Sequence, residues 1–230
     1  LRRFAEEERY ASLEYRQTDE AGERWMELSY RMVQLEEGGN VYAYLSVTDI
    51  DERKRRELDL ENKAEHDALT GLLNRQSASL RMTDALERTV ERGYRGAFAI
   101  IDLDDFKQVN DTYGHLSGDT VLAGVAQHLR TAFRKGDLIC RWGGDEFVVY
   151  CEDMEREDMT KRIADLSAGP WNATVQDDQV IELSVSTGIA MVPQDGTAFK
   201  TVYERADRAL YQAKSKAKAH FCFFETGSDA

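Results

Sequence analysis

Carboxylates stand at two places in the sequence where a β-strand is expected to end. Asp102 directly follows the apolar run Ala97–Ile101. Asp145 and Glu146 directly follow the glycine pair Gly143-Gly144. Mg²⁺ prefers hard oxygen ligands and commonly carries substrate phosphates, and Mn²⁺ accepts similar ligands. If the two strand ends are neighbours in the fold, their carboxylates would form a Mg²⁺ or Mn²⁺ site for a phosphate-bearing ligand.

Two elements must position these carboxylates. The stretch Leu138–Tyr150 has apolar flanks around Gly143-Gly144, which predicts a tight hairpin because glycine permits the positive φ angles of a short turn. The stretch Gly96–Ile101 predicts a buried strand that ends at Asp102. An acidic hairpin tip can also be no more than a solvent-exposed turn. The second carboxylate centre at Asp102 favours a ligand site, since such sites often lie where strands end.

From residue 67 onward the pattern alternates between helices and strands. Helices are expected at Leu80–Val90, at two stretches within Phe106–Phe133 that separate near Gly114, at Arg156–Leu166 and at Phe199–Lys216. Further strands are expected at Val180–Val192 and Phe221–Phe224. Helices interleaved with a mixed sheet predict an α+β domain.

The N-terminal part has a different pattern. Aromatic and β-branched residues in Trp25–Val33 and Val41–Thr48, on either side of Glu36–Asn40, predict antiparallel strands joined by a hairpin. Residues 51–66 carry both signs of charge without glycine or proline, which predicts an exposed helix. Two or three strands alone are marginally stable. Because the chain also begins with Leu1 rather than Met, we expect a fragment whose sheet is completed by a missing N-terminal portion or a partner chain.

The net charge of −13, from 30 Lys and Arg against 43 Asp and Glu, is spread over both parts of the chain. It offers no large positive field, so we expect neither nucleic acid nor a membrane surface as a partner of this fragment. The apolar runs are only a few residues long, whereas a membrane span needs about 20. The cysteines have no paired spacing, which predicts free thiols in a reducing compartment. They are Cys140, Cys151 and Cys222.

Five sequence blocks, in order, resemble the GGDEF domain of diguanylate cyclases. The signature block is Gly143-Gly144-Asp145-Glu146-Phe147. The other blocks are Asp67–Arg75, Asp102–Asp119, Ser186–Ala190 and Ala206–Lys214. The resemblance extends over residues 64–230, which is far more than a match to one pentapeptide.

This resemblance implies a fold related to adenylyl cyclases and polymerase palms, with a ferredoxin-like core. It also implies a homodimer in which each domain holds one GTP. Each 3′-hydroxyl would attack the α-phosphate of the other GTP, giving cyclic di-GMP and pyrophosphate. Asp102, Asp145 and the backbone carbonyl of Leu103 resemble the metal ligands of the family. Glu146 would assist at the metal or deprotonate the hydroxyl, and the backbone of Gly143-Gly144 would lie against the nucleotide.

Asn110 and Asp119 resemble the guanine-binding residues of the family. A carboxylate accepts hydrogen bonds from N1–H and the exocyclic amine of guanine, a donor pair that adenine lacks, so Asp119 favours GTP over ATP. Both residue types also suit helix caps, which is the alternative role. His115 lies near the same pocket, either as a ligand contact or as a packing and hydrogen-bonding side chain.

Lysines are the expected phosphate contacts. Lys107 is one, Lys214 occupies the lysine position of the family, and Lys218 follows four residues later on the same helical face. The family usually continues with Gly-Arg-Asn, whereas this chain has Ala217-Lys218-Ala219. Lysine keeps the charge but lacks the two-pronged geometry of arginine, so we expect retained activity with weaker triphosphate binding. A solvated basic helix end is the alternative.

The segment Arg134-Lys135-Gly136-Asp137 matches the RxxD motif at the spacing of the family before the signature. In this family the motif binds the product and inhibits the enzyme. Arginine can stack on guanine and pair with phosphate, while aspartate can accept hydrogen bonds from a guanine edge. An exposed turn would use the same residue types. The resemblance therefore assigns Arg134 and Asp137 to an inhibitory cyclic di-GMP site.

The stretch Glu14–Arg56 resembles, more loosely, the C-terminal half of a PAS sensor domain and its junction with an output helix. An ordinary β-hairpin packing module is the alternative. We therefore divide the chain into a partial PAS-like sensor segment (1–50), a helical linker (51–66) and a GGDEF diguanylate cyclase domain (67–230). A helix from a dimerising sensor would control the distance between two cyclase domains.

The leading prediction is a Mg²⁺-dependent diguanylate cyclase in a bacterial cytoplasm, regulated by its N-terminal segment. The alternative is a catalytically weak GGDEF domain that binds GTP or cyclic di-GMP as a signalling module. The intact acidic residues Asp102, Asp145 and Glu146 argue against that alternative. Asp119 disfavours an adenylyl cyclase.

Overall fold

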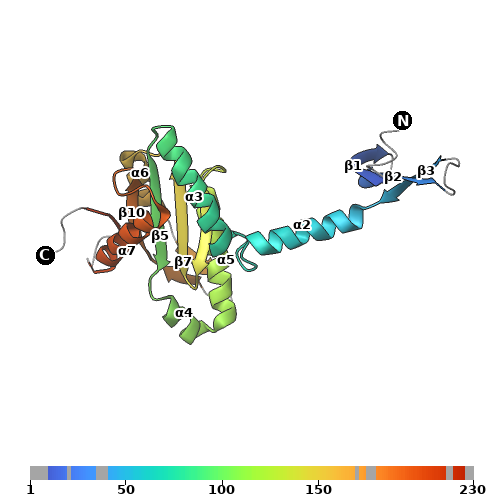
Figure 1. The fold of residues 1–230 in the computed structure, drawn as a ribbon. Helices are drawn as coiled ribbons and strands as arrows, with labels where there is room; N and C mark the ends of the chain where they lie inside the picture. The colour runs from blue at the N-terminus through green and yellow to red at the C-terminus, as the bar shows by residue number, and fades with distance from the viewer. Residues whose placement is uncertain are drawn as a thin grey trace. The chain divides into compact units, whose positions relative to one another are not determined.

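The computed structural model describes residues 10–19, 22–34, 41–168, 171–174, 180–215 and 220–225. The chain divides into two compact units, Leu1–Asn62 and Lys63–Ala230. Figure 1 shows the ribbon of the chain with its helices and several of its strands labelled. Each unit is described by itself below.

The first unit contains an antiparallel sheet of three strands in the order β1-β2-β3. The strands are β1 (Tyr10–Asp19), β2 (Gly22–Gln34) and β3 (Val41–Asp49). The antiparallel strands predicted from the aromatic and β-branched runs are therefore confirmed. The predicted loop Glu36–Asn40 lies outside the described residues.

Helix α2 (Asp51–Glu65) follows β3 after one residue, in agreement with the predicted linker helix. Its first turn is attached to the sheet by Glu14, which binds Arg53 at 2.7 Å and Lys54 at 2.6 Å. Ile50 is 5% exposed, and its backbone N–H donates to the carbonyl of Trp25 at 2.9 Å. The start of the helix is therefore held to the strands by both packing and ion pairs.

The second unit is built on a six-stranded mixed sheet in the order β11-β10-β5-β7-β6-β4. The β10–β11 and β4–β6 pairs are parallel, and the other pairs are antiparallel. The strands are β4 (Leu73–Asn74), β5 (Gly96–Leu103), β6 (Leu138–Gly143), β7 (Glu146–Glu152), β10 (Val185–Val192) and β11 (Phe221–Phe223). This mixed sheet, together with the helices of the unit, confirms the predicted α+β class.

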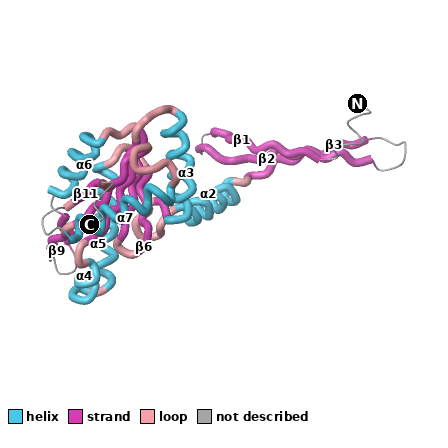
Figure 2. Tube along the Cα trace, turned by 60° about the vertical axis from the view of Figure 1, so that its left-hand side comes forward, coloured by secondary structure: helices cyan, strands magenta, loops and turns pink. Residues whose placement is uncertain are grey.

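In the described part of this unit, five helices and a second, smaller sheet accompany the six-stranded sheet. They are the helices α3 (Arg75–Glu91), α4 (Phe106–Tyr113), α5 (His115–Ala132), α6 (Arg156–Ala168) and α7 (Phe199–Ser215), and a separate two-stranded sheet of β8 (Trp171–Thr174) with β9 (Val180–Leu183). Figure 1 shows strands β5 and β7 with helices around them, and Figure 2 shows the strands of this unit in magenta with helices on their outside. The predicted break between two helices near Gly114 is confirmed, because Gly114 has a φ of +82° there.

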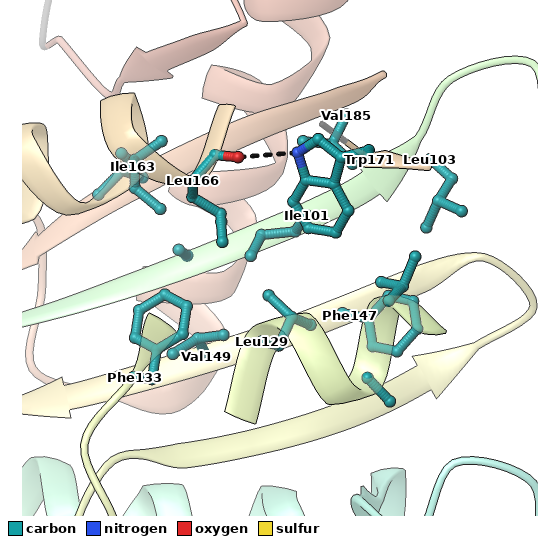
Figure 3. Packing of buried hydrophobic residues seen from close by; sticks show 14 of the residues in the cluster. Ile101, Leu103, Leu129, Phe133, Phe147, Val149, Ile163, Leu166, Trp171 and Val185 are labelled. Atoms are coloured by element: carbon teal, nitrogen blue, oxygen red, sulfur yellow. Dashed lines mark hydrogen bonds between the residues drawn. The ribbon is translucent and has the colours of Figure 1, made fainter. Parts of the chain in front are cut away.

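The side chains of β5 alternate between two cores, one on each face of the sheet. Ala97, Ala99 and Ile101 pack with residues of α5 and α6 (Figure 3). Phe98 and Ile100 pack with residues of α3 and α7. A strand covered on both faces has no polar face, which explains the continuous apolar run in this part of the sequence. The sheet is therefore the central layer of the second unit.

The apolar positions of the helices have the spacing that such packing requires. The buried residues of α3 are Ala78, Met82, Ala85, Leu86 and Thr89, and those of α7 are Val202, Ala206, Ala209, Leu210 and Ala213. These positions recur every three or four residues and so form one face of each helix. Trp171 is buried in the core that contains residues of α5 and α6 (Figure 3). Its indole N–H donates to the carbonyl of Leu166 at 2.8 Å.

The structure differs from the sequence prediction at several element ends. Helix α3 begins at Arg75, five residues before the predicted start, because the side chain of Asn74 caps it by accepting from the N–H of Ser77 at 3.0 Å. Strands β4 and β8 were not predicted. The expected strand Val180–Val192 is divided at Ser184 into β9 and β10. The last predicted residue of the final helix, Lys216, lies outside the described residues.

The three cysteines are free, as predicted. Among the described residues, no helix is both long enough and apolar enough to span a membrane.

We expect Gly188→Ala to destabilise the second unit. Gly188 lies in β10 where α7 crosses it, and a Cβ atom there would lie 2.1 Å from the carbonyl oxygen of Ala206 and 2.2 Å from the backbone nitrogen of Leu210. Both atoms belong to the backbone of the helix, so the helix must move away from the sheet. The expected loss is about 1–3 kcal/mol in the free energy of unfolding, measured in urea.

Gly124→Ala is the matched control. Gly124 lies in α5 with no atom within 4 Å of a Cβ position, so alanine there should leave stability unchanged or raise it by up to about 1 kcal/mol. Equal unfolding midpoints for the two variants would contradict the proposed close packing of α7.

Candidate active site at the ends of β5 and β7

The two carboxylate centres predicted from the sequence lie side by side. Strands β5 and β7 are antiparallel, and their register places Asp102 opposite Glu146. The backbone N–H of Leu103 lies 3.4 Å from the carbonyl oxygen of Asp145. The end of one strand therefore meets the start of the other, and three acidic side chains share one edge of the sheet.

Carboxylate side chains lie close together and half-buried at this edge of the sheet. Burial raises the pKa of Asp102, the charges of Asp145 and Asp104 raise it further, and the Lys214 ammonium opposes them. Burial also raises the pKa of Glu146, and the charge of Asp102 adds to that effect. Lys214 Nζ lies 2.6 Å from Asp102 Oδ1. The carboxylates at this edge are thus arranged to accept a cation.

The donor set fits a hard divalent ion. Asp102 and Asp145 provide carboxylate oxygens, and the side chain of Leu103 is only 1% exposed, so this residue could contribute only its backbone carbonyl. Among the described residues, no three His, Cys, Asp or Glu side chains are grouped so that they could enclose a metal. Two carboxylates and a carbonyl suit Mg²⁺, which usually keeps waters and takes further oxygens from phosphates.

The hairpin tip is open to a ligand. Gly143 and Gly144 are exposed, and no atom lies within 4 Å of a Cβ position on either residue. Gly144 has a φ of +55°, a value that favours glycine, whereas Gly143 does not have a positive φ. Arg141 holds the turn, since its Nε and Nη2 donate to the carbonyl oxygen of Gly144 at 3.0 and 2.9 Å.

Arg141 also connects this turn to the segment that follows α2. Its Nη1 lies 3.3 Å from both carboxylate oxygens of Asp67. The same carboxylate accepts hydrogen bonds from the backbone N–H and the hydroxyl of Thr70 at 2.9 and 2.7 Å. Burial would raise the pKa of Asp67, but the bonds from Thr70 and the charge of Arg141 outweigh it and lower the pKa. Arg141 was not predicted as a site residue, because its partner Asp67 is 74 residues away in the sequence.

The residues predicted to bind guanine lie on consecutive helices. Asn110 is half-buried in α4, and Asp119 is exposed in α5. The residues that cap these helices are Asp105 and Gly114, so the alternative role of Asn110 and Asp119 as caps is wrong.

Gly118 makes room for the side chain of Asn110. A Cβ atom at Gly118 would lie 2.0 Å from Asn110 Oδ1 and 3.2 Å from Phe106 Cζ. Any larger residue would therefore displace the amide. His115 is exposed at the first turn of α5, so it is not a packing residue of the core.

Of the three lysines predicted to bind phosphate, the structure describes two. Lys214 contacts Asp102 and so belongs to the carboxylate cluster rather than to a merely solvated helix end. Lys107 is exposed in the first turn of α4, four residues after the end of β5. Lys218 lies outside the described residues.

Tyr203 is a second side chain that sequence analysis missed. Its hydroxyl donates to Glu146 Oε1 at 3.1 Å. Burial raises the pKa of Tyr203 to about 12, with the neighbouring charge of Glu146 as the next cause, so the hydroxyl keeps its proton at neutral pH. No local pattern marks this contact, because helix α7 and strand β7 are distant in the sequence.

The RxxD segment borders a different cavity, of about 610 Å³. Its lining includes Arg134, Asp153, Lys161, Arg162 and His128. Asp158 and Asp165 line it as well, so its charged side chains are of both signs. Asp102, Asp145 and Glu146 are not among its lining residues, so the cavity is separate from the carboxylate cluster.

Asp137, the other residue that the RxxD resemblance assigns to an inhibitory site, is not among the residues that line this cavity. Its side chain is only 4% exposed, because its carboxylate accepts from the backbone N–H of Arg134 at 2.8 Å and pairs with Arg162 at 3.0 Å. Asp137 thus contacts the backbone of Arg134 and the guanidinium of Arg162. The side chain of Arg134 remains 54% exposed. Arg162 was not predicted, since nothing in its local sequence connects it with Asp137.

Known proteins are similar to this chain over the second unit. The family model "Diguanylate cyclase, GGDEF domain" matches residues 64–220. Diguanylate cyclase TpbB of Pseudomonas aeruginosa is 36% identical over 161 residues, which are 69% of this chain and 37% of that protein. The chain spans between about a quarter and two fifths of the length of the first curated relatives that it matches.

Two solved structures have the same fold. The GGDEF domain of TpbB from Pseudomonas aeruginosa superimposes with a TM-score of 0.64 at 33% identity, over 70% of this chain and 94% of that one. The coiled coil and GGDEF domain of DgcB from Caulobacter crescentus, solved in complex with c-di-GMP, gives a TM-score of 0.67 at 27% identity, over 75% and 92%. Since the family model covers more than half of the residues, the chain belongs to the family of GGDEF domains described as diguanylate cyclases.

Proposed function

We propose that this chain is a diguanylate cyclase that condenses two GTP molecules into cyclic di-GMP and pyrophosphate. The observation that carries the proposal is the register of β5 and β7, which joins Asp102, Asp145 and Glu146 in one half-buried acidic cluster with Lys214. The names of similar proteins, such as diguanylate cyclases TpbB and DgcM, support it. The free thiols agree with the reducing cytoplasm that we propose as its compartment.

Phosphoryl transfer requires positioning and charge neutralisation more than covalent chemistry from the protein. Asp102, Asp145 and the carbonyl of Leu103 would hold Mg²⁺ or Mn²⁺, which when bound would neutralise charge on the phosphates. Lys214 has an ammonium 2.6 Å from Asp102 and is therefore placed to pair with a phosphate oxygen, together with the exposed Lys107. Glu146 would receive the proton of the attacking hydroxyl or assist at the metal.

The guanine base would bind between α4 and α5. Asn110 has an amide that can both donate and accept, and Gly118 leaves the space in which that amide lies. Asp119 and His115 are exposed on the first turns of α5, where they can reach a bound base. A carboxylate without a guanine partner would lose its hydrogen bonds on binding ATP, which favours GTP.

The product requires two copies of the domain. Cyclic di-GMP contains two equivalent phosphodiester bonds, whereas the cluster at β5 and β7 is a single site. Two identical sites that face each other across a two-fold axis would form both bonds by the same chemistry. We therefore propose that catalysis takes place in a homodimer.

Loss of one metal-binding carboxylate tests the activity. Incubated with Mg²⁺ and GTP, the protein should produce cyclic di-GMP, identified by mass spectrometry, and ATP should give no cyclic dinucleotide. Asp145→Asn should lower the rate by about 100-fold or more, because it removes a charge that the transition state needs. Asp84→Asn, the same change at an exposed position of α3, should leave the rate unchanged. An unmutated protein that binds GTP without forming product would favour the alternative, a non-catalytic binding module.

We also propose that cyclic di-GMP inhibits the enzyme at the cavity beside the RxxD segment, through the arginines that line it. Arg134 and Arg162 border this cavity and are both held by the buried carboxylate of Asp137. Arginine pairs with phosphate through two parallel hydrogen bonds and stacks on bases, which matches the chemistry of the product.

Arg134→Ala should raise the concentration of cyclic di-GMP that halves the rate by about 10-fold or more, the effect of a lost charged hydrogen bond. The inhibition is measured by adding product to the unmutated protein and to the variant. Arg92→Ala, an exposed arginine at the end of α3, should keep the original inhibition. Identical inhibition of the Arg134 variant and the unmutated protein would refute the site.

We further propose that the N-terminal segment, as the end of a PAS-like sensor, regulates the enzyme through α2. The helix is attached at its start by Glu14 to the strands of the first unit. In the second unit, its last residue, Glu65, pairs with Arg81 at 2.5 Å. Two residues beyond Glu65, Asp67 binds Arg141, which holds the catalytic turn. A continuous set of contacts therefore leads from the end of the helix to the hairpin tip.

Insertions after Glu57 test this regulation by rotating one end of α2 against the other. Two inserted alanines rotate the helix by about 200°, whereas seven restore nearly two full turns. We expect the two-residue insertion to change the rate of cyclic di-GMP formation several-fold, and the seven-residue insertion to return it towards the original rate. Equal rates in all three proteins would contradict control through the helix.

A further inference from the structure

Glu146 depends on a single side chain for its orientation. Its Oε1 accepts a hydrogen bond from the hydroxyl of Tyr203 at 3.1 Å. In the part of the chain that the structure describes, no other hydrogen bond or ion pair is recorded for this carboxylate. Without Tyr203 the carboxylate would therefore be free to rotate.

The ring of Tyr203 is itself fixed by an aromatic cluster, formed by Phe98, Trp142, Phe199 and Tyr203. The ring centroid of Tyr203 lies 5.2 Å from that of Trp142 and 6.2 Å from those of Phe98 and Phe199. These residues come from strands β5 and β6 and from the first two turns of α7. Aromatic contacts at such distances restrict the ring to one orientation.

Trp142 has a further contact outside this cluster. The guanidinium of Arg75, at the start of α3, lies 4.8 Å from the ring centroid of Trp142. Trp142 directly precedes Gly143, so the aromatic cluster is continuous with the hairpin that carries Asp145 and Glu146. The hydroxyl of Tyr203 is thus presented to Glu146 from a rigid support, which is the arrangement that pre-organises an active-site group.

We propose that Tyr203 is a positioning residue for Glu146, holding its carboxylate in the orientation needed at the reacting hydroxyl or the metal. The inference rests on the proposed cyclase function. A role in packing alone would need only the ring, whereas positioning needs the hydroxyl. The two roles therefore predict different results for the removal of a single oxygen atom.

Tyr203→Phe removes that oxygen and keeps the ring. Because Glu146 acts in the transition state, the loss should appear in kcat, by about 10-fold, while KM for GTP changes less than about two-fold. The melting temperature should stay within about 2 °C of the unmutated protein, since the ring contacts remain. Tyr94→Phe, the same change at a partly exposed residue after α3, should alter neither constant.

A double-mutant cycle with Glu146→Gln separates positioning from packing. If Tyr203 acts through Glu146, Tyr203→Phe should reduce kcat much less in the Glu146→Gln background than in the unmutated protein. A kcat for Tyr203→Phe equal to that of the unmutated enzyme, an equal reduction in both backgrounds, or a loss confined to KM would each overturn the positioning role. Absence of cyclic di-GMP from the unmutated protein would instead refute the proposed function, so the two failures are distinguishable.

Discussion

The register between β5 and β7 is the constraint on which the rest of this site depends. It places Asp102 opposite Glu146, and a shift by one residue would turn every side chain of the strand to the other face of the sheet. Phe98 would then leave the core beneath α3 and α7, and Ile101 would leave the core beneath α5 and α6. Because both faces are buried, such a shift would disrupt two cores at once. Packing in the centre of the sheet therefore determines the distance between carboxylates at its edge.

Helix α7 is the second constraint, because it supplies a partner to each carboxylate centre. Lys214 reaches Asp102, and Tyr203 reaches Glu146. These two residues are separated by about three helical turns and so lie on one face of the helix. The helix can approach the sheet closely only because residue 188 has no Cβ atom. A single glycine in the core thus determines how two polar side chains reach the active site.

Much of the fold could be predicted from local patterns. The apolar run of β5, the hairpin around Gly143-Gly144 and the helix break at Gly114 all follow from residues adjacent in the sequence. The two-residue strand β4 and the short strand β8 could not be predicted, because segments of this length carry too few residues for a periodic pattern. The early start of α3 depends on the cap at Asn74, a residue type that is common at helix N-termini.

The site residues divide in the same way. Some are indicated by the local sequence, and others depend on contacts with residues far away in the sequence. Asp102 and Asp145 could be predicted because Asp102 follows the apolar run of β5 and Asp145 follows the glycine pair of the hairpin turn. Arg141, Tyr203 and Arg162 could not, because their partners are 74, 57 and 25 residues away. Each of these three side chains holds an acidic residue in place. The sequence therefore indicates which groups carry out the chemistry, while the long-range contacts that orient those groups become visible only when the strands and helices are assembled.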